Sequence, residues 1–125
     1  DNMKAYLEGL TALHDGTLQF GEGTPKAVHP IVVKHPESGR KLLYVNEAFT
    51  SHINEVSREE SKAILEFLYE HQKRPEWSIR FRWQPHSIAF WDNRCAHHRA
   101  ISDYLPNVRS GFRVQVEGTE APVAP

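Results

Sequence analysis

The chain has 125 residues, of which 39% are hydrophobic and 25% charged, with a formal net charge of −1. This composition is typical of one small globular domain, and the balanced charge indicates no nucleic-acid partner. No apolar run approaches the ~18 residues that span a bilayer, and the first residues lack the layout of a signal peptide. The single cysteine, Cys95, allows no internal disulfide, so the sequence predicts a cytoplasmic protein that contacts no membrane.

The N-terminal segment predicts a helix followed by a loop. Apolar residues recur at helical spacing from Met3 to Leu13, after Asp1-Asn2, which is a suitable cap. His14-Asp15-Gly16 ends this pattern. Residues 16–28 contain three glycines and a proline, and this composition predicts a mobile loop.

Two strands and a second helix are predicted next. Ile31–Lys34 and Lys41–Val45 have strand composition, and the turn residues His35–Gly39 join them. Ser57-Arg58-Glu59-Glu60 fits a capping box, in which the serine and the second glutamate satisfy each other's backbone N–H groups. The apolar residues that follow predict a surface helix with one buried face: Ile64, Leu65, Phe67 and Leu68.

Strands are predicted to dominate the second half of the chain. Trp77–Trp83 alternates apolar and polar residues, Gln84-Pro85-His86 is a turn, and Ser87–Trp91 has the composition of a buried strand. Arg109–Val116 alternates as well, whereas the Pro- and Ala-rich tail Glu117–Pro125 is expected to fray. Strands with helices packed outside predict a mainly β fold with flanking helices, a double-stranded β-helix or jelly roll.

Two arginines lie on one face of the last predicted strand. Arg109 and Arg113 follow His98 by eleven and fifteen residues, and Gly111 between them leaves space for a ligand. Burying two guanidiniums is costly unless anions meet them, whereas a cavity that binds a carboxylate or sulfonate offers bidentate, charge-assisted hydrogen bonds. An exposed cationic stripe on an edge strand is the alternative for these two residues.

A series of motifs follows in order, with short gaps, between residues 29 and 116. They are His29-Pro-Ile-Val-Val33, His35-Pro-Glu-Ser-Gly-Arg40, Leu43-Tyr-Val-Asn-Glu-Ala-Phe-Thr50, Arg82-Trp-Gln-Pro85, Ile88-Ala-Phe-Trp-Asp-Asn-Arg94, His98, Asp103-Tyr-Leu-Pro106, Arg109 and Arg113. The series closely resembles the C-terminal half of the taurine dioxygenase (TauD/TfdA) family of iron(II)- and 2-oxoglutarate-dependent enzymes. The resemblance implies that residues 1–125 are the C-terminal part of a single jelly-roll domain of such a dioxygenase.

The resemblance also implies roles for individual residues. His98 is then an iron ligand, Arg109 binds the distal carboxylate of 2-oxoglutarate, and Arg113 receives the sulfonate or other anionic end of the substrate. Phe49 matches an aromatic residue that lines the substrate pocket, with a plain core role as its alternative. The implied reaction hydroxylates a small sulfonate or sulfate with dioxygen and releases sulfite, succinate and carbon dioxide. The implied cofactor and cosubstrate are Fe(II) and 2-oxoglutarate.

One part of the family's site has no match in this chain. The family's first histidine and its carboxylate form a His-x-Asp or His-x-Glu pair far upstream of the last histidine. His35-Pro36-Glu37 fits this string, but it lies in a predicted turn that the resemblance places away from the metal. Asp92 matches a residue outside the metal shell and is expected to have a turn or hydrogen-bonding role, and Cys95 is expected to be a buried core thiol.

Three functions stay open on the sequence alone. The first is a taurine-type sulfonate dioxygenase, and the second is a dioxygenase for another anionic substrate such as an alkyl sulfate or an aryloxyalkanoate. The third is a non-catalytic jelly-roll fragment that retains an anion site without iron. The sequence also leaves open whether the chain is a fragment or a divergent short protein, and whether it forms a homo-oligomer.

Overall fold

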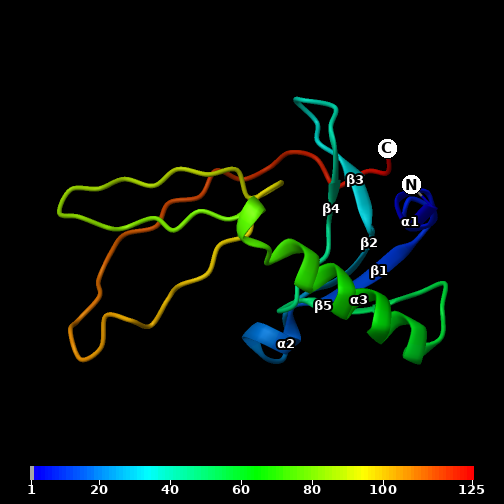
Figure 1. The fold of residues 1–125 in the computed structure, drawn as a ribbon, viewed down its shortest axis with the longest axis horizontal. Coiled ribbons are helices and arrows are strands. Elements are labelled where there is room, and N and C mark those ends of the chain that lie inside the picture. The colour runs from blue at the N-terminus through cyan, green and yellow to red at the C-terminus, as the bar shows by residue number, and fades with distance from the viewer. Residues whose placement is uncertain (1) are drawn as a thin grey trace.

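The computed structural model describes residues 2–125, which form two parts: a body of residues 2–77 and an arm of residues 78–125 (Figure 1). The body contains helices and strands, whereas the arm leaves it as long extended loops and returns to it near the C-terminus. In chain order the elements are α1 (Asn2–Leu7), β1 (Thr11–Asp15), α2 (Thr17–Phe20), β2 (Lys26–Pro30), β3 (Val32–Lys34), β4 (Lys41–Leu43), β5 (Thr50–Ile53), α3 (Arg58–Gln72) and a 3₁₀ turn, Pro75–Trp77. No helix among residues 2–125 is long and apolar enough to cross a membrane.

Two antiparallel sheets build the body. The first has the order β2-β1-β5, so β1 is the central strand, and its pairing with β5 shifts register between Leu13 and His14. The second is the hairpin β3-β4, in which Val32 pairs with Leu43. Ile31 joins the two sheets, because its N–H donates to the Leu10 carbonyl and its own carbonyl accepts the N–H of Tyr44.

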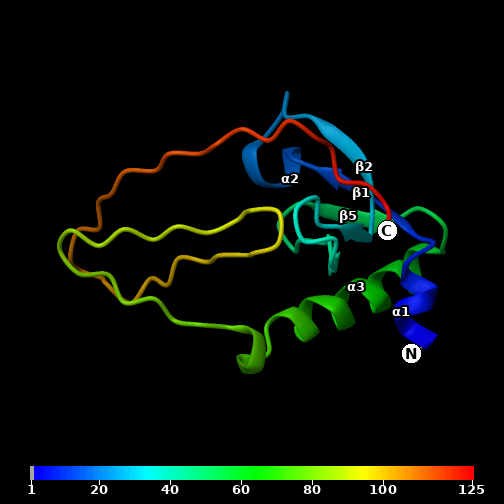
Figure 2. The same cartoon turned by 90° about the horizontal axis from the view of Figure 1, so that it is seen from above.

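The core lies between these strands and α3, which runs along one side of them (Figure 2). Ser61, Leu65 and Leu68 repeat at helical spacing and are the buried face of α3. The predicted surface helix is thus confirmed, but Phe67, which was expected on the buried face, is 51% exposed. The buried Ser61 hydroxyl accepts the N–H of Ile53 at 2.9 Å and so fastens the helix to β5. The buried apolar residues are Leu7, Leu10, Ala12, Ile31, Val32, Val45, Ile53, Leu65 and Leu68.

The predicted capping box at the start of α3 is confirmed. The Ser57 hydroxyl accepts the Glu60 N–H, and the Glu60 carboxylate accepts the Ser57 N–H at 2.9 Å. These two bonds satisfy donors that a helix start leaves free. The predicted hairpin at residues 31–45 is also present, with strands that are shorter than expected.

The N-terminal prediction is wrong in two respects, while the proposed cap at Asp1 lies outside the described residues. The first helix ends at Leu7, and Thr11–Asp15 is a strand, because hydrogen-bonding neighbours on both sides outweigh the helical spacing of Leu10 and Leu13. Residues 16–28 are not a single loop but contain α2 and the start of β2. The chain packs closely there, since a Cβ at Gly16 would clash with the Thr24 methyl group.

The strands predicted in the second half are not formed in the described chain. Residues 78–83, 87–91 and 109–116 are extended but lie in no sheet, and Trp77 ends the 3₁₀ turn instead of starting a strand. Many of their apolar side chains are almost fully exposed, among them Phe90 at 94% and Phe112 at 107%. Alternation makes a strand only where a neighbouring strand supplies hydrogen bonds and a packing face.

Two smaller expectations for the arm also change. Cys95 is exposed rather than buried, and the predicted strand Ser87–Trp91 just before it does not form. The tail is not wholly free, since the Val123 carbonyl accepts the Lys34 N–H at 3.0 Å on the edge of β3.

Candidate functional site

A tight turn in the arm carries the motif that ends in His98. The Asp92 carboxylate accepts the Arg94 backbone N–H at 2.8 Å, and the Asp92 carbonyl accepts the N–H groups of Cys95 and Ala96. An aspartate in this arrangement replaces a backbone partner and stabilises the reversal of the chain. The turn therefore depends on Asp92 through both its side chain and its backbone.

Arg94 closes an ion pair across the same turn. Its Nε lies 3.0 Å from Asp92 Oδ1, and its Nη2 lies 2.7 Å from Oδ2. This fork geometry is the strong form of the arginine–carboxylate contact. The Arg94 guanidinium and backbone N–H hold the pKa of Asp92 well below its usual range, with a smaller contribution from His35. Asp92 is therefore an anion at physiological pH.

His35 links this turn to the body across 57 positions of sequence. Its Nε2 lies 3.1 Å from Asp92 Oδ2, and its side chain is only 11% exposed. The prediction that His35 lies in the turn between two strands is confirmed, since it follows directly on β3. A longer contact of 3.8 Å joins Glu37 of that turn to Arg94.

His35, Asp92 and Cys95 place three donor atoms within 4.8 Å of one another, which is close enough to share a metal ion. The Asp92 carboxylate, however, already accepts the Arg94 guanidinium through both oxygens. A divalent cation there would displace a strong hydrogen-bonded pair and meet a positive charge at close range. We therefore assign this group to hydrogen bonding and not to metal binding.

His98 packs against Trp91 across the turn. The two rings lie 4.7 Å apart between centroids and are tilted by 53°. Trp91 is itself tied down, because its indole N–H donates to the Asn93 amide oxygen at 2.8 Å. His98 is exposed, and within residues 2–125 it belongs to no group of three metal-binding side chains. The described residues therefore fit one ligand of a metal centre and not a complete one.

Arg109 and Arg113 lie in the extended part of the arm and are exposed. The shared strand face that the sequence predicts for them is not formed in the described chain, since the segment pairs with no other strand. Arg109 does have a packing partner, because its guanidinium lies 5.9 Å from the centre of the Tyr104 ring. A guanidinium over an aromatic face keeps its N–H edges free for an anion.

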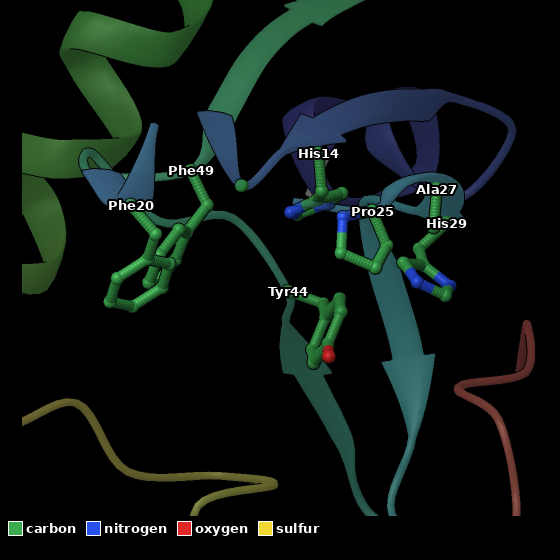
Figure 3. A pocket seen from close by; sticks show the side chains of 8 residues that line it. His14, Phe20, Pro25, Ala27, His29, Tyr44 and Phe49 are labelled. Carbon is green, nitrogen blue, oxygen red and sulfur yellow. The ribbon is translucent and has the colours of Figure 1, made fainter. Parts of the chain in front are cut away.

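Phe49 lines a pocket of about 240 Å³ in the body (Figure 3). Its ring stacks on that of Phe20, with centroids 5.7 Å apart. Phe20 was not predicted from the sequence, because it lies in α2 within the predicted loop and is part of no periodic pattern. The lining residues are His14, Gly16, Phe20, Pro25, Ala27, His29, Tyr44 and Phe49.

His14 in this pocket is held neutral by its surroundings. Burial, followed by the charge of nearby His29, lowers the pKa of His14 to about 4. The His14, His29 and Tyr44 rings lie 5.5 to 5.6 Å apart and form one aromatic cluster. The buried Nε2 of His14 has no hydrogen-bond partner among the described residues, whereas its Nδ1 lies 3.4 Å from the Thr50 hydroxyl.

Residues 1–115 match the family described as "Taurine catabolism dioxygenase TauD, TfdA family". The chain belongs to this family, as the motifs around His98 indicate. A taurine dioxygenase structure from Burkholderia xenovorans is 41% identical, with a TM-score of 0.67, over 75% of this chain and 32% of the other. A structure titled AAD-2 in complex with Mn(II) and N-oxalylglycine is 29% identical, with a TM-score of 0.58, over 67% of this chain and 37% of the other. The prediction of a partial jelly roll, mainly β with flanking helices, is thereby confirmed.

Three curated relatives carry related activities in their names. An alpha-ketoglutarate-dependent sulfonate dioxygenase of Saccharomyces cerevisiae is 41% identical over 98 residues, 77% of this chain and 24% of the relative. A sulfate ester dioxygenase of Pseudomonas putida is 37% identical over 76% of this chain and 31% of its own length. A 2,4-dichlorophenoxyacetate dioxygenase of Cupriavidus pinatubonensis is 33% identical over 78% and 38% respectively. The chain thus spans about a third of the length of the relatives it matches.

The lowered pKa of His14 predicts a loss of stability in mild acid. Between the ordinary pKa of 6.5 and the folded value of about 4, the unfolded chain binds the proton and the folded chain does not. The free energy of unfolding of the complete protein should therefore fall as the pH decreases from 7 to 5, by up to about 1.4 kcal/mol per pH unit from this group. Urea unfolding at pH 7 and at pH 5 measures this change in the free energy of unfolding.

The variant His14→Leu should flatten this dependence because leucine does not titrate. The control Phe49→Leu changes the same pocket but removes no titratable group, so it should keep the wild-type dependence. Equal slopes for the wild type and His14→Leu would show that His14 is not the responsible group.

Proposed function

We propose that this chain is the C-terminal third of an iron(II)- and 2-oxoglutarate-dependent dioxygenase that hydroxylates a small sulfonate or sulfate. The observation that carries the proposal is the ordered turn from Trp91 to His98, followed by two arginines, within a match to the TauD, TfdA family. In this proposal the second histidine and the carboxylate of the iron site come from the part of the fold that the chain does not span.

His98 is proposed to supply one imidazole ligand to the iron. Its exposed ring is free to present a nitrogen, while the Trp91 ring at 4.7 Å limits its rotation. A single neutral imidazole is a weak site alone, so two further ligands are needed to hold the metal. Bound iron(II), with 2-oxoglutarate on it, would supply the dioxygen activation that no amino-acid side chain provides.

Arg109 is proposed to hold the distal carboxylate of 2-oxoglutarate. A planar guanidinium forms two parallel hydrogen bonds to a carboxylate, which fixes both the position and the orientation of the ligand. The Tyr104 ring beneath Arg109 leaves the N–H edges of the guanidinium available for this contact. This contact would fix the position and the orientation of the cosubstrate in the site.

Arg113 and Phe49 are proposed to bind the substrate. Once residues 109–116 pair as a strand, Arg113 lies on the face of Arg109, four positions further along. Its charge matches a sulfonate, sulfate or carboxylate end, while Phe49 and Phe20 offer an apolar wall to the carbon chain. The small volume of the pocket, about 240 Å³, favours a short substrate.

The substrate class is tested by offering the complete protein three kinds of anion. Taurine-like sulfonates, alkyl sulfates and aryloxyacetates each give a different product, and consumption of 2-oxoglutarate reports turnover for all three. The yeast and Pseudomonas relatives, named for sulfonates and sulfate esters, support sulfonate or sulfate turnover with release of sulfite or sulfate. Turnover of aryloxyacetates alone would support the alternative substrate, and no turnover of any kind would support a non-catalytic fragment.

Replacing Arg109 by lysine should damage cosubstrate binding in particular. Lysine keeps the positive charge but loses the two-pronged geometry, so Arg109→Lys in the complete protein should raise the KM for 2-oxoglutarate by at least about tenfold. The KM for the organic substrate should change far less, and steady-state kinetics with each substrate varied in turn measures both. An unchanged KM for 2-oxoglutarate would remove Arg109 from the cosubstrate site.

Removing the charge of Arg113 should instead weaken binding of the anionic substrate. We expect Arg113→Ala to raise the KM for the substrate by about 10- to 100-fold, the value of a charge-assisted hydrogen bond. The slow consumption of 2-oxoglutarate without substrate should largely survive. An equal loss of turnover with anionic and neutral substrate analogues would show that Arg113 does not bind the anionic group of the substrate.

A further inference from the structure

We propose that His35 is a positioning residue for the iron ligand His98, and that it acts by holding the Asp92 carboxylate at the base of the turn that carries His98. The inference rests on the proposed function of His98 and adds a residue from a distant hairpin to the site. It concerns the contact between His35 Nε2 and Asp92 Oδ2 at 3.1 Å (Figure 2 shows the turn, in yellow, reaching the hairpin side of the body).

The hydrogen bonds around His35 fix which of its nitrogens carries the proton. Nδ1 lies 3.3 Å from the backbone N of Glu37 and 3.2 Å from that of Ser38, so it accepts their N–H groups. In a neutral imidazole the other nitrogen then carries the proton. Nε2–H therefore donates to Asp92, and the imidazole is oriented by its own hairpin turn before it meets the arm.

The body thus fixes one oxygen of Asp92, and Asp92 fixes the turn. With one carboxylate oxygen directed to His35, the other accepts the Arg94 backbone N–H at 2.8 Å. The Asp92 carbonyl accepts the N–H groups of Cys95 and Ala96. A displacement of this carboxylate would therefore move the backbone on both sides of the turn.

The turn at Asp92 determines the position of His98. It brings the chain back on itself so that the His98 ring lies against that of Trp91, at 4.7 Å between centroids. Residues that hold a metal ligand through hydrogen bonds typically change metal affinity by 10- to 100-fold when altered. His35 fits such a role because its side chain is 11% exposed and is held by bonds on both ring nitrogens.

Two amide substitutions separate this role from a purely local one in the hairpin. Asparagine places its oxygen near the position of Nδ1, so His35→Asn keeps an acceptor for the Glu37 and Ser38 N–H groups but does not reach Asp92. Glutamine places its amide nitrogen near the position of Nε2, so His35→Gln reaches Asp92 but loses the contacts within the turn. Both variants are to be made in the complete protein.

The affinity for iron(II), measured anaerobically by competition with a chromophoric chelator, is the readout. We expect His35→Gln to remain within about threefold of wild type and His35→Asn to bind iron(II) 10- to 100-fold more weakly. Equal affinities in the two variants, whether retained or lost, would overturn the proposal. The reverse order would also overturn it and would assign His35 to the hairpin alone.

Two further variants complete the experiment. Glu37→Gln removes the exposed contact with Arg94 at 3.8 Å and should leave iron(II) affinity unchanged, which controls for any change of charge in the hairpin. His98→Ala tests the ligand itself. If His98→Ala binds iron(II) as well as wild type does, the proposed function of His98 fails. If it binds poorly while the His35 variants are equal, only the positioning role fails.

Discussion

Pairing of the backbone is the constraint on which this structure depends. Every strand needs a neighbour for its N–H and C=O groups, and a face on which to pack its side chains. In the body this is satisfied: β1 has a partner on each side, and Ile31 joins the two sheets. In the arm this need for a neighbouring strand is not met. The alternating segment 109–116 has no strand beside it, and Phe112 and Val114 are exposed to solvent.

The proposed site residues differ in the same way, because some are held by the body and others lie in the unpaired arm. The turn from Trp91 to His98 is held by its own hydrogen bonds and by His35 of the body, so the proposed metal ligand His98 has a defined place within this chain. The arginines have only the Tyr104 contact and need a partner strand to share a face. We propose that this partner belongs to the remaining two thirds of the dioxygenase fold, and that the anion sites and the iron site are completed together.

The sequence predicted the features that depend on neighbouring residues. The capping box at Ser57 and the turn after β3 are local, and both are present. The family motif around His98 could also be identified from the sequence, because its residues are contiguous. Strand β1 was missed because the spacing of Leu10 and Leu13 suits a helix, and only the two flanking strands decide the outcome.

Contacts between distant segments could not be predicted. The bond from His35 to Asp92 spans 57 positions, and the stacking of Phe20 on Phe49 joins a short helix to a loop. Neither pair shows a periodic pattern. The strands expected in the arm illustrate the opposite error, since an alternating pattern such as 109–116 states which face is apolar but not whether another strand is present to cover it.

We propose that this chain supplies one iron ligand and the anion-binding arginines to a site that other segments complete. The most direct test is the visible charge-transfer band that forms when iron(II) and 2-oxoglutarate bind together without oxygen. We expect a band for the complete protein and none for the isolated 125-residue chain, because one imidazole does not hold the metal. A clear band from the isolated chain would contradict it, and would mean that residues 1–125 already contain a full set of iron ligands.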